Sequence, residues 1–144
     1  MSLFSALSTG ASGMAAQRAR AELLTENLAN AETTRTPEGG PYRRKDVIFT
    51  STEVGSPFAS VFSSELETAG GVTVADLVTD TRDPERRYLP GHPDADGEGY
   101  VAFPRVNPAE DMVDLMSAAR GYEANVAAIS AVKDMIARSL DLLR

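Results

Sequence analysis

The sequence has 144 residues, no cysteine and a net charge of −7 at pH 7. That length suits one small domain with helical extensions, and the absence of thiols excludes disulfides, thiolate metal sites and a cysteine nucleophile. Nine acidic and three basic side chains lie between positions 61 and 104. Because phosphate binding needs a basic face, this acidic middle argues against a nucleic-acid partner.

The charge pattern also bears on targeting. Hydrophobic residues make up 42% of the chain, but no run approaches the roughly 20 consecutive apolar residues that cross a bilayer. Arg18 and Arg20 follow the mild apolar stretch at positions 1–16 instead of preceding it. This order is wrong for a secretory signal, so we expect export, if it occurs, without a cleaved signal peptide.

The first predicted element is a helix from Leu3 to Ala31, where apolar residues recur every seven positions. Such a repeat places a narrow seam on one side of a helix, and another helix must cover it. Gly10 and Gly13 each cost roughly 0.5–1 kcal/mol relative to alanine. We interpret them as points of close packing, where a neighbouring backbone can approach. The alternative is that this helix is weak and frays when alone. The predicted interface residues are Leu3, Leu7, Gly10, Gly13, Met14, Ala21, Leu24 and Leu28.

The middle of the chain, positions 36–106, has no helical period. Short β-favouring runs predict strands at 42–50, 72–79, 86–89 and 100–103, separated by turns rich in glycine and proline. We expect Val72, Val74 and Val78 to face one way, and a loop over 51–64. The basic run at 43–45 is interpreted as a solvated strand edge.

The last predicted element, a helix from Pro108 to Leu143, has the clearest start. Asn107 can cap it, proline suits the first helical position, and Glu110 completes a capping box. At 1.5 Å per residue it would be about 54 Å long, too long for its seam to be buried by this chain's small middle. Lys133 interrupts the seam and can set its register. The predicted interface residues are Met112, Leu115, Ala119, Tyr122, Val126, Ile129, Ile136, Leu140 and Leu143.

Together these elements predict an α+β fold in which long terminal helices form a coiled-coil layer beside a small β-rich element. The expected division is an N-terminal helix over 1–35, a β-rich segment with loops over 36–106, and a C-terminal helix over 107–144.

The sequence shows no active site. It has no nucleophile elbow, phosphate-binding loop or dinucleotide-binding glycine motif. The turn from His92 through Pro93 and Asp94 to Glu98 has metal-ligand residue types, but its spacing does not match a calcium loop, and His92 is the only histidine. We therefore predict no catalytic, metal-binding or cofactor-binding residues, and interpret the seams as surfaces between subunits.

Four motifs resemble those of bacterial flagellar rod and hook proteins. An N-terminal motif spans 27–34, and a C-terminal motif spans 117–126. Two middle motifs, at 41–45 and at 90–101, resemble one proximal-rod class in particular. Gly121 stands where that family often has a larger residue, at an expected cost in helix stability. The motif residues are Asn27, Ala29, Asn30, Thr33, His92, Pro93, Asp94, Arg120, Tyr122, Glu123, Ala124 and Asn125.

The resemblance implies a structural protein without catalysis or cofactor. It would pass unfolded through the flagellar type III export apparatus and assemble in the periplasm with copies of itself and other rod proteins. The terminal helices would form the inner layer of a rod that transmits motor torque, with the β segment outside. Two alternatives are another axial subunit of the rod or hook, and a cytoplasmic adaptor or chaperone that binds partner helices.

Overall fold

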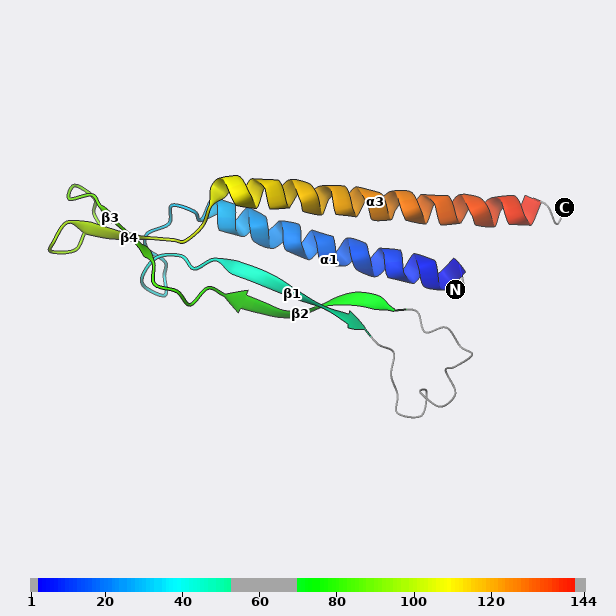
Figure 1. The fold of residues 1–144 in the computed structure, drawn as a ribbon, viewed down its shortest axis with the longest axis horizontal. Helices are drawn as coiled ribbons and strands as arrows, with labels where there is room; N and C mark the ends of the chain where they lie inside the picture. Colours follow the sequence, from blue (N-terminus) through cyan, green and yellow to red (C-terminus); the bar gives the residue numbers. More distant parts are fainter. Residues whose placement is uncertain (1–2, 53–69, 142–144) are drawn as a thin grey trace, which may run out of the picture.

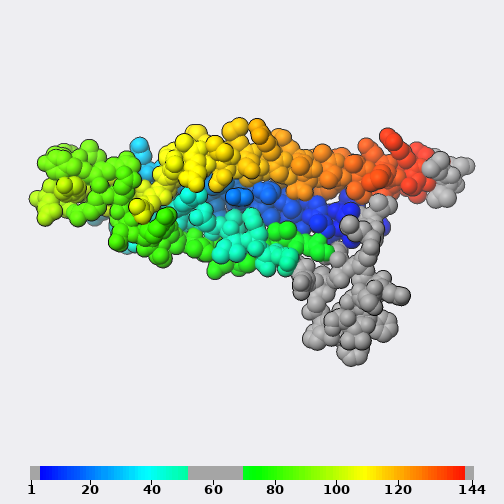
Figure 2. Space-filling model, in the orientation of Figure 1, coloured from blue at the N-terminus to red at the C-terminus, as the bar shows by residue number. Residues whose placement is uncertain are grey.

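The computed structural model describes residues 3–52 and 70–141. Two helices, α1 (Leu3–Ala29) and α3 (Pro108–Asp141), run side by side in opposite directions (Figure 1). A hairpin of β1 (Lys45–Thr52) and β2 (Gly71–Thr79) lies along α1 on its other side. Among the described elements, α3 contacts α1 and no strand, so α1 is the middle of three layers (Figure 2).

A second hairpin lies beyond the C-terminal end of α1. Its strands, β3 (Glu85–Tyr88) and β4 (Tyr100–Phe103), pair with each other and not with β1 or β2. We call residues 80–104 the head. Val101 and Phe103 form its small buried core, and the rings of Tyr88 and Tyr100 pack edge to face at 5.3 Å. Within the described residues, the β-rich middle therefore contains two separate two-stranded sheets.

The predicted α+β class with long terminal helices is confirmed. Helix α1 ends two residues earlier than predicted, at a turn that is stabilised by side-chain hydrogen bonds within the same segment. The Asn30 side-chain amide donates to the Glu26 carbonyl at 2.9 Å, and the Thr33 hydroxyl donates to Asn30 Oδ1 at 3.1 Å. At the start of α3 the predicted cap is confirmed, because Asn107 Oδ1 accepts from the backbone N–H of Ala109 at 3.2 Å.

Three of the four described strands differ from the prediction in their bounds. Strand β1 begins at Lys45 and not at position 42, and it continues through Ser51 and Thr52. The rest of the predicted loop over 51–64 lies outside the described residues. Strand β2 starts one residue earlier than predicted, β3 both starts and ends one residue earlier, and β4 has the predicted bounds.

The prediction that Val72, Val74 and Val78 share a face is wrong for Val78. Phe49 pairs with Val74, but the preceding Ile48 pairs with Asp76, so Ala75 is an extra residue in β2. Such a bulge shifts the alternation by one, and residues beyond it exchange faces.

Candidate assembly interface

Glycines let α1 and α3 approach closely. A Cβ at Gly10 would lie 2.9 Å from Ile129 Cγ1, and one at Gly13 would lie 3.0 Å from Asn125 Nδ2. On the opposing helix, a Cβ at Gly121 would lie 3.2 Å from Gln17 Cδ. Each glycine therefore receives a side chain of the other helix, where we expected an approaching backbone. Gly121 therefore has a packing role in the contact between the helices.

The residues predicted for α1 lie on its packed sides. Leu24 is buried and the others whose side chains are described are half-buried. They form two stripes. One faces α3, and the other runs along the edge of the contact between the helices. The side chain of Leu3 lies outside the described part of the structure. The half-buried residues are Leu7, Gly10, Gly13, Met14, Ala21 and Leu28.

The residues predicted for α3 divide differently. Leu115, Ile129 and Ile136 are half-buried towards α1. The contact also uses a stripe one position from the predicted one, including the buried Ala118 and the half-buried Asn125 and Val132. The remaining predicted residues are exposed to solvent in this single chain, and Leu143 lies outside the described residues. Those exposed are Met112, Ala119, Tyr122, Val126 and Leu140.

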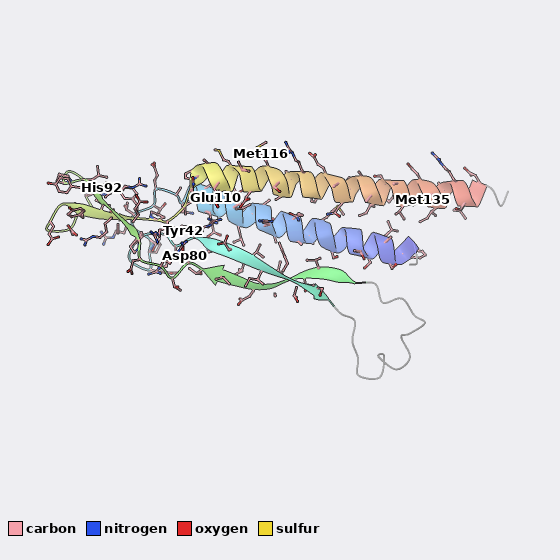
Figure 3. The ribbon with its side chains drawn as sticks, in the orientation of Figure 1. Tyr42, Asp80, His92, Glu110, Met116 and Met135 are labelled. Carbon is pink, nitrogen blue, oxygen red and sulfur yellow. The ribbon has the colours of Figure 1, made fainter. Side chains whose placement is uncertain are left out.

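Further apolar side chains on α3 are exposed. Met116 is 57% exposed and projects from the side away from α1 (Figure 3). Val113 and Met135 are at least half exposed. The heptad pattern missed these residues because they do not lie on its two stripes. Helix α3 therefore has apolar surface that the described part of the chain leaves uncovered.

The N-terminal motif anchors the hairpin to α1. Asn27 is fully buried, and its side-chain amide donates to the Lys45 carbonyl at 2.8 Å. Its Oδ1 accepts from the Lys45 N–H at 3.0 Å and from the Tyr42 hydroxyl at 2.9 Å. Burial raises the pKa of Tyr42 to about 12, so its hydroxyl stays protonated as the donor. The Asn27 side chain thus makes the backbone hydrogen bonds to Lys45, the first residue of β1, that a neighbouring strand would otherwise make.

The N-terminal motif also meets the His92-Pro93-Asp94 turn. The Thr34 hydroxyl donates to Asp94 Oδ2 at 2.7 Å, and Arg35 lies 3.7 Å from Asp94 Oδ1. His92 Nδ1 accepts from the backbone N–H of Asp94 at 3.1 Å, which fixes the turn. Together these contacts join the head to the end of α1. Within the described residues, no group of three or more His, Cys, Asp or Glu side chains could hold a metal ion.

The basic run joins the layers, a role that sequence reasoning missed. Arg44 Nη2 lies 3.0 Å from the carboxylate of Asp111, which is 1% exposed, and Lys45 Nζ lies 2.6 Å from Glu26. The expectation of a solvated strand edge is therefore wrong for Arg44 and Lys45 and holds only for the exposed Arg43. Burial raises the pKa of Asp111, and the Arg44 charge opposes that rise.

The C-terminal motif is divided between the inside and the outside. Asn125 packs over Gly13 and donates its side-chain amide to the Gly121 carbonyl at 3.0 Å. Arg120, Glu123 and Ala124 are exposed, and Tyr122 is 41% exposed. Within this motif Asn125 therefore positions the helix pair, and its four other named residues are exposed to solvent.

Two protein families match this chain at its ends. The family described as "Flagella basal body rod protein" matches residues 7–35, over most of α1 and its terminal turn. The family described as "Flagellar basal body rod FlgEFG protein C-terminal" matches residues 98–142, over β4 and α3. With the paired terminal helices, these matches define a flagellar rod protein.

Curated relatives identify the family more narrowly. The flagellar basal-body rod protein FlgC of Bacillus subtilis is 41% identical, with 99% of each chain covered. That of Borreliella burgdorferi is 40% identical, covering 100% of this chain and 99% of its own. That of Escherichia coli O6:H1 is 37% identical, covering 99% and 98%. The chain belongs to the FlgC family of flagellar basal-body rod proteins.

Membership of the FlgC family confirms two predictions. It confirms the class of flagellar protein that the four motifs resemble, and it confirms the function of a structural subunit of the basal-body rod. These relatives are named as rod proteins and not as enzymes. Their names support a location in the flagellar basal body. No helix in the described part of the chain is long and apolar enough to span a membrane.

Proposed function

We propose that this chain is a subunit of the proximal rod, and that it assembles through α1 and α3 with copies of itself and other rod proteins. The observation that carries the proposal is the uncovered apolar surface of α3, whose Met112 and Leu140 are more than half exposed. A soluble protein gains free energy when neighbours cover such a surface. The residues that would be covered are the exposed members of the predicted interface.

The rod would transmit torque because densely packed helices resist deformation. The proposed division keeps the three parts expected from the sequence: helix 1–35 and helix 107–144 in the packed layer, and 36–106 carrying the hairpins. The chain would act without catalysis or cofactor, and nucleic acid and small-molecule substrates would not be partners.

A deletion strain of the source bacterium provides the test. The strain should be non-motile, and complementation with this chain should restore swimming and place the chain in purified basal bodies. A chain that restores swimming yet stays in the soluble fraction would instead support the adaptor alternative. A reconstruction of the basal body would show which rod segment contains it and separate the proximal rod from other axial positions.

We further propose that the chain reaches the periplasm through the flagellar type III apparatus and keeps its N-terminus. The late position of Arg18 and Arg20 in the sequence supports this proposal. Mass spectrometry of the chain taken from basal bodies should find the residues near position 1. A chain that begins after residue 20 would contradict the proposal.

A further inference from the structure

We propose that Met112 and Met116 on α3 are a site of oxidation by peroxide, and that conversion of either thioether to its sulfoxide keeps the free chain out of the rod. This inference rests on the proposed function and deepens it, because it states what regulates assembly through α3. We call the two residues the methionine pair.

The side chains of the methionine pair are open to solvent. The sequence has no cysteine, so its five methionines are its only oxidisable sulfur groups. Met112 is 53% exposed and Met116 is 57% exposed. Of the other described methionines, Met14 on α1 is half-buried and Met135, near the end of α3, is 50% exposed. An oxidant needs access to the sulfur atom, so the pair can react in the free chain.

The pair lies on the side of α3 that α1 does not cover. The two residues are four positions apart, which places them one turn apart on the same side of the helix. Ala118 is buried in the contact with α1, and at about 100° per residue it is turned roughly 200° from Met116. Figure 3 shows Met116 pointing away from α1. Val113, at 65% exposed, lies beside the pair and extends its apolar surface.

The charges near the methionine pair favour an uncharged oxidant. Glu110 and Asp114 lie two positions before and two positions after Met112, and no basic residue occurs between positions 106 and 119. These carboxylates repel an anionic oxidant, but they do not repel hydrogen peroxide, which is uncharged at neutral pH. We therefore take hydrogen peroxide as the oxidant.

The reaction adds one oxygen atom to a methionine. A sulfur lone pair attacks one peroxide oxygen, and the O–O bond breaks as the S–O bond forms. The departing hydroxide takes the proton of the transferred hydroxyl group to give water. The thioether is thus oxidised to a sulfoxide, and the peroxide is reduced.

The product changes the surface that assembly would cover. A methionine side chain is apolar and adaptable, whereas its sulfoxide has a polar S–O group. Burying such a group beside apolar neighbours without a hydrogen-bond partner is unfavourable, so one sulfoxide should reduce incorporation of the chain roughly tenfold. In a finished rod the neighbouring subunits would exclude peroxide from the pair. The modification would therefore act on the chain before assembly.

Mass spectrometry tests the site. The purified full-length chain and purified basal bodies are treated with hydrogen peroxide, and fragment spectra locate each added oxygen. In the free chain we expect Met112, Met116 and Met135 to gain oxygen before Met14. In basal bodies Met112 and Met116 should stay reduced under the same treatment. Equal oxidation of the pair in both samples, or earlier oxidation of Met14, would overturn the inference.

Two variants test the effect on assembly. Met112→Leu with Met116→Leu keeps apolar side chains of similar size but removes the sulfur, and Met112→Gln with Met116→Gln places permanent polar groups at the same positions. The leucine variant should enter basal bodies as the unmodified chain does, and the glutamine variant roughly tenfold less. Circular dichroism of the purified glutamine variant should match that of the unmodified chain, which separates an assembly defect from misfolding.

Competition between two chains tests the regulation. A deletion strain that lacks methionine sulfoxide reductases produces the unmodified chain and the leucine variant together, and grows with sublethal hydrogen peroxide. We expect the leucine variant to gain share in the basal bodies, because it cannot form the sulfoxide. Equal shares with and without peroxide would overturn the inference. Absence of the unmodified chain from untreated basal bodies would instead show that the proposed function itself has failed.

Discussion

The buried Asn27 side chain bonds to both backbone groups of Lys45 and to the Tyr42 hydroxyl. Asn27→Leu keeps the approximate volume but leaves three polar groups without partners, at about 1–3 kcal/mol each. We expect a loss of about 3 kcal/mol or more in the free energy of unfolding, measured by urea denaturation. Tyr42→Phe is the matched control. It removes one of the three hydrogen bonds and should cost about 1 kcal/mol. Equal effects from the two variants would contradict this role for Asn27.

The ion pair of Arg44 and Asp111 gives a second prediction. Both carboxylate oxygens of Asp111 are buried and lack a well-directed hydrogen bond. Removing one partner of a buried pair leaves the other charge uncompensated, so Asp111→Leu and Arg44→Met should each destabilise by about 3–5 kcal/mol. The double variant should recover most of that loss. A double-mutant cycle in urea measures the coupling, and additive losses would show that the two side chains act independently.

Asp80 gives a prediction about pH. The Arg82 guanidinium, at 2.9 Å from both carboxylate oxygens, lowers the pKa of Asp80 to about 2. Because the pKa is lower in the folded state, the stabilisation is complete above the unfolded value of about 4. It is lost as pH falls towards 2. We expect Asp80→Asn to be less stable than the unmodified chain at pH 6 and nearly equal to it at pH 2. A difference that does not change with pH would assign the effect to something other than ionisation.

At the scale of elements, an alanine methyl group would meet different atoms at the two glycines of α1. At Gly10 the methyl group would meet Ile129 Cγ1, which is held close to the backbone by the branched Cβ. At Gly13 it would meet the end of the Asn125 side chain, which can move. Gly10→Ala should therefore cost about 1–3 kcal/mol from overpacking. Gly13→Ala should change stability by less than about 1 kcal/mol, because the gain in helix propensity offsets the contact. Thermal unfolding followed by circular dichroism compares the two. Equal melting temperatures would contradict this difference.

The sequence predicted the type of every described element, and it failed where tertiary contacts decide the details. The two helices were found because the period and the Asn107 cap are local signals. The start of β1 was missed because Asn27, eighteen residues earlier, fixes it. The face of Val78 was missed because the bulge at Ala75 depends on pairing with β1. No pattern in either strand alone contains that information.

At the scale of the whole molecule, a charge introduced on the exposed stripe of α3 should have a different effect from one introduced on its half-buried stripe. Val126→Asp changes a residue that is exposed in the single chain, so the thermal stability of the purified protein should stay within about 0.5 kcal/mol of the original. Its incorporation into basal bodies should fall, because assembly would bury an unpaired charge. Ile129→Asp, by contrast, should lower both. Swimming assays and immunoblots measure incorporation, and a fully motile Val126→Asp strain would contradict our assignment of this stripe.

Sequence reasoning predicted interface residues on both helices, but it could not tell which of them the contact between α1 and α3 covers and which stay exposed. Heptad spacing identifies two stripes on each helix without saying which stripe the other helix of the same chain occupies. The contacts of Thr34 with Asp94 and of Arg44 with Asp111 join residues more than 59 positions apart. Such pairs follow from the fold and have no local signal.

The pairing of α1 with α3 joins the first and last described elements of the chain, and this has a consequence for the order of folding. Gly10 meets Ile129 only after the chain between them has closed into a loop. The entropy cost of closure rises with loop length, and contacts between distant residues form slowly. A ribosome that has made α1 and both hairpins has not yet made its partner helix. The nascent chain therefore stays open until α3 has also been made.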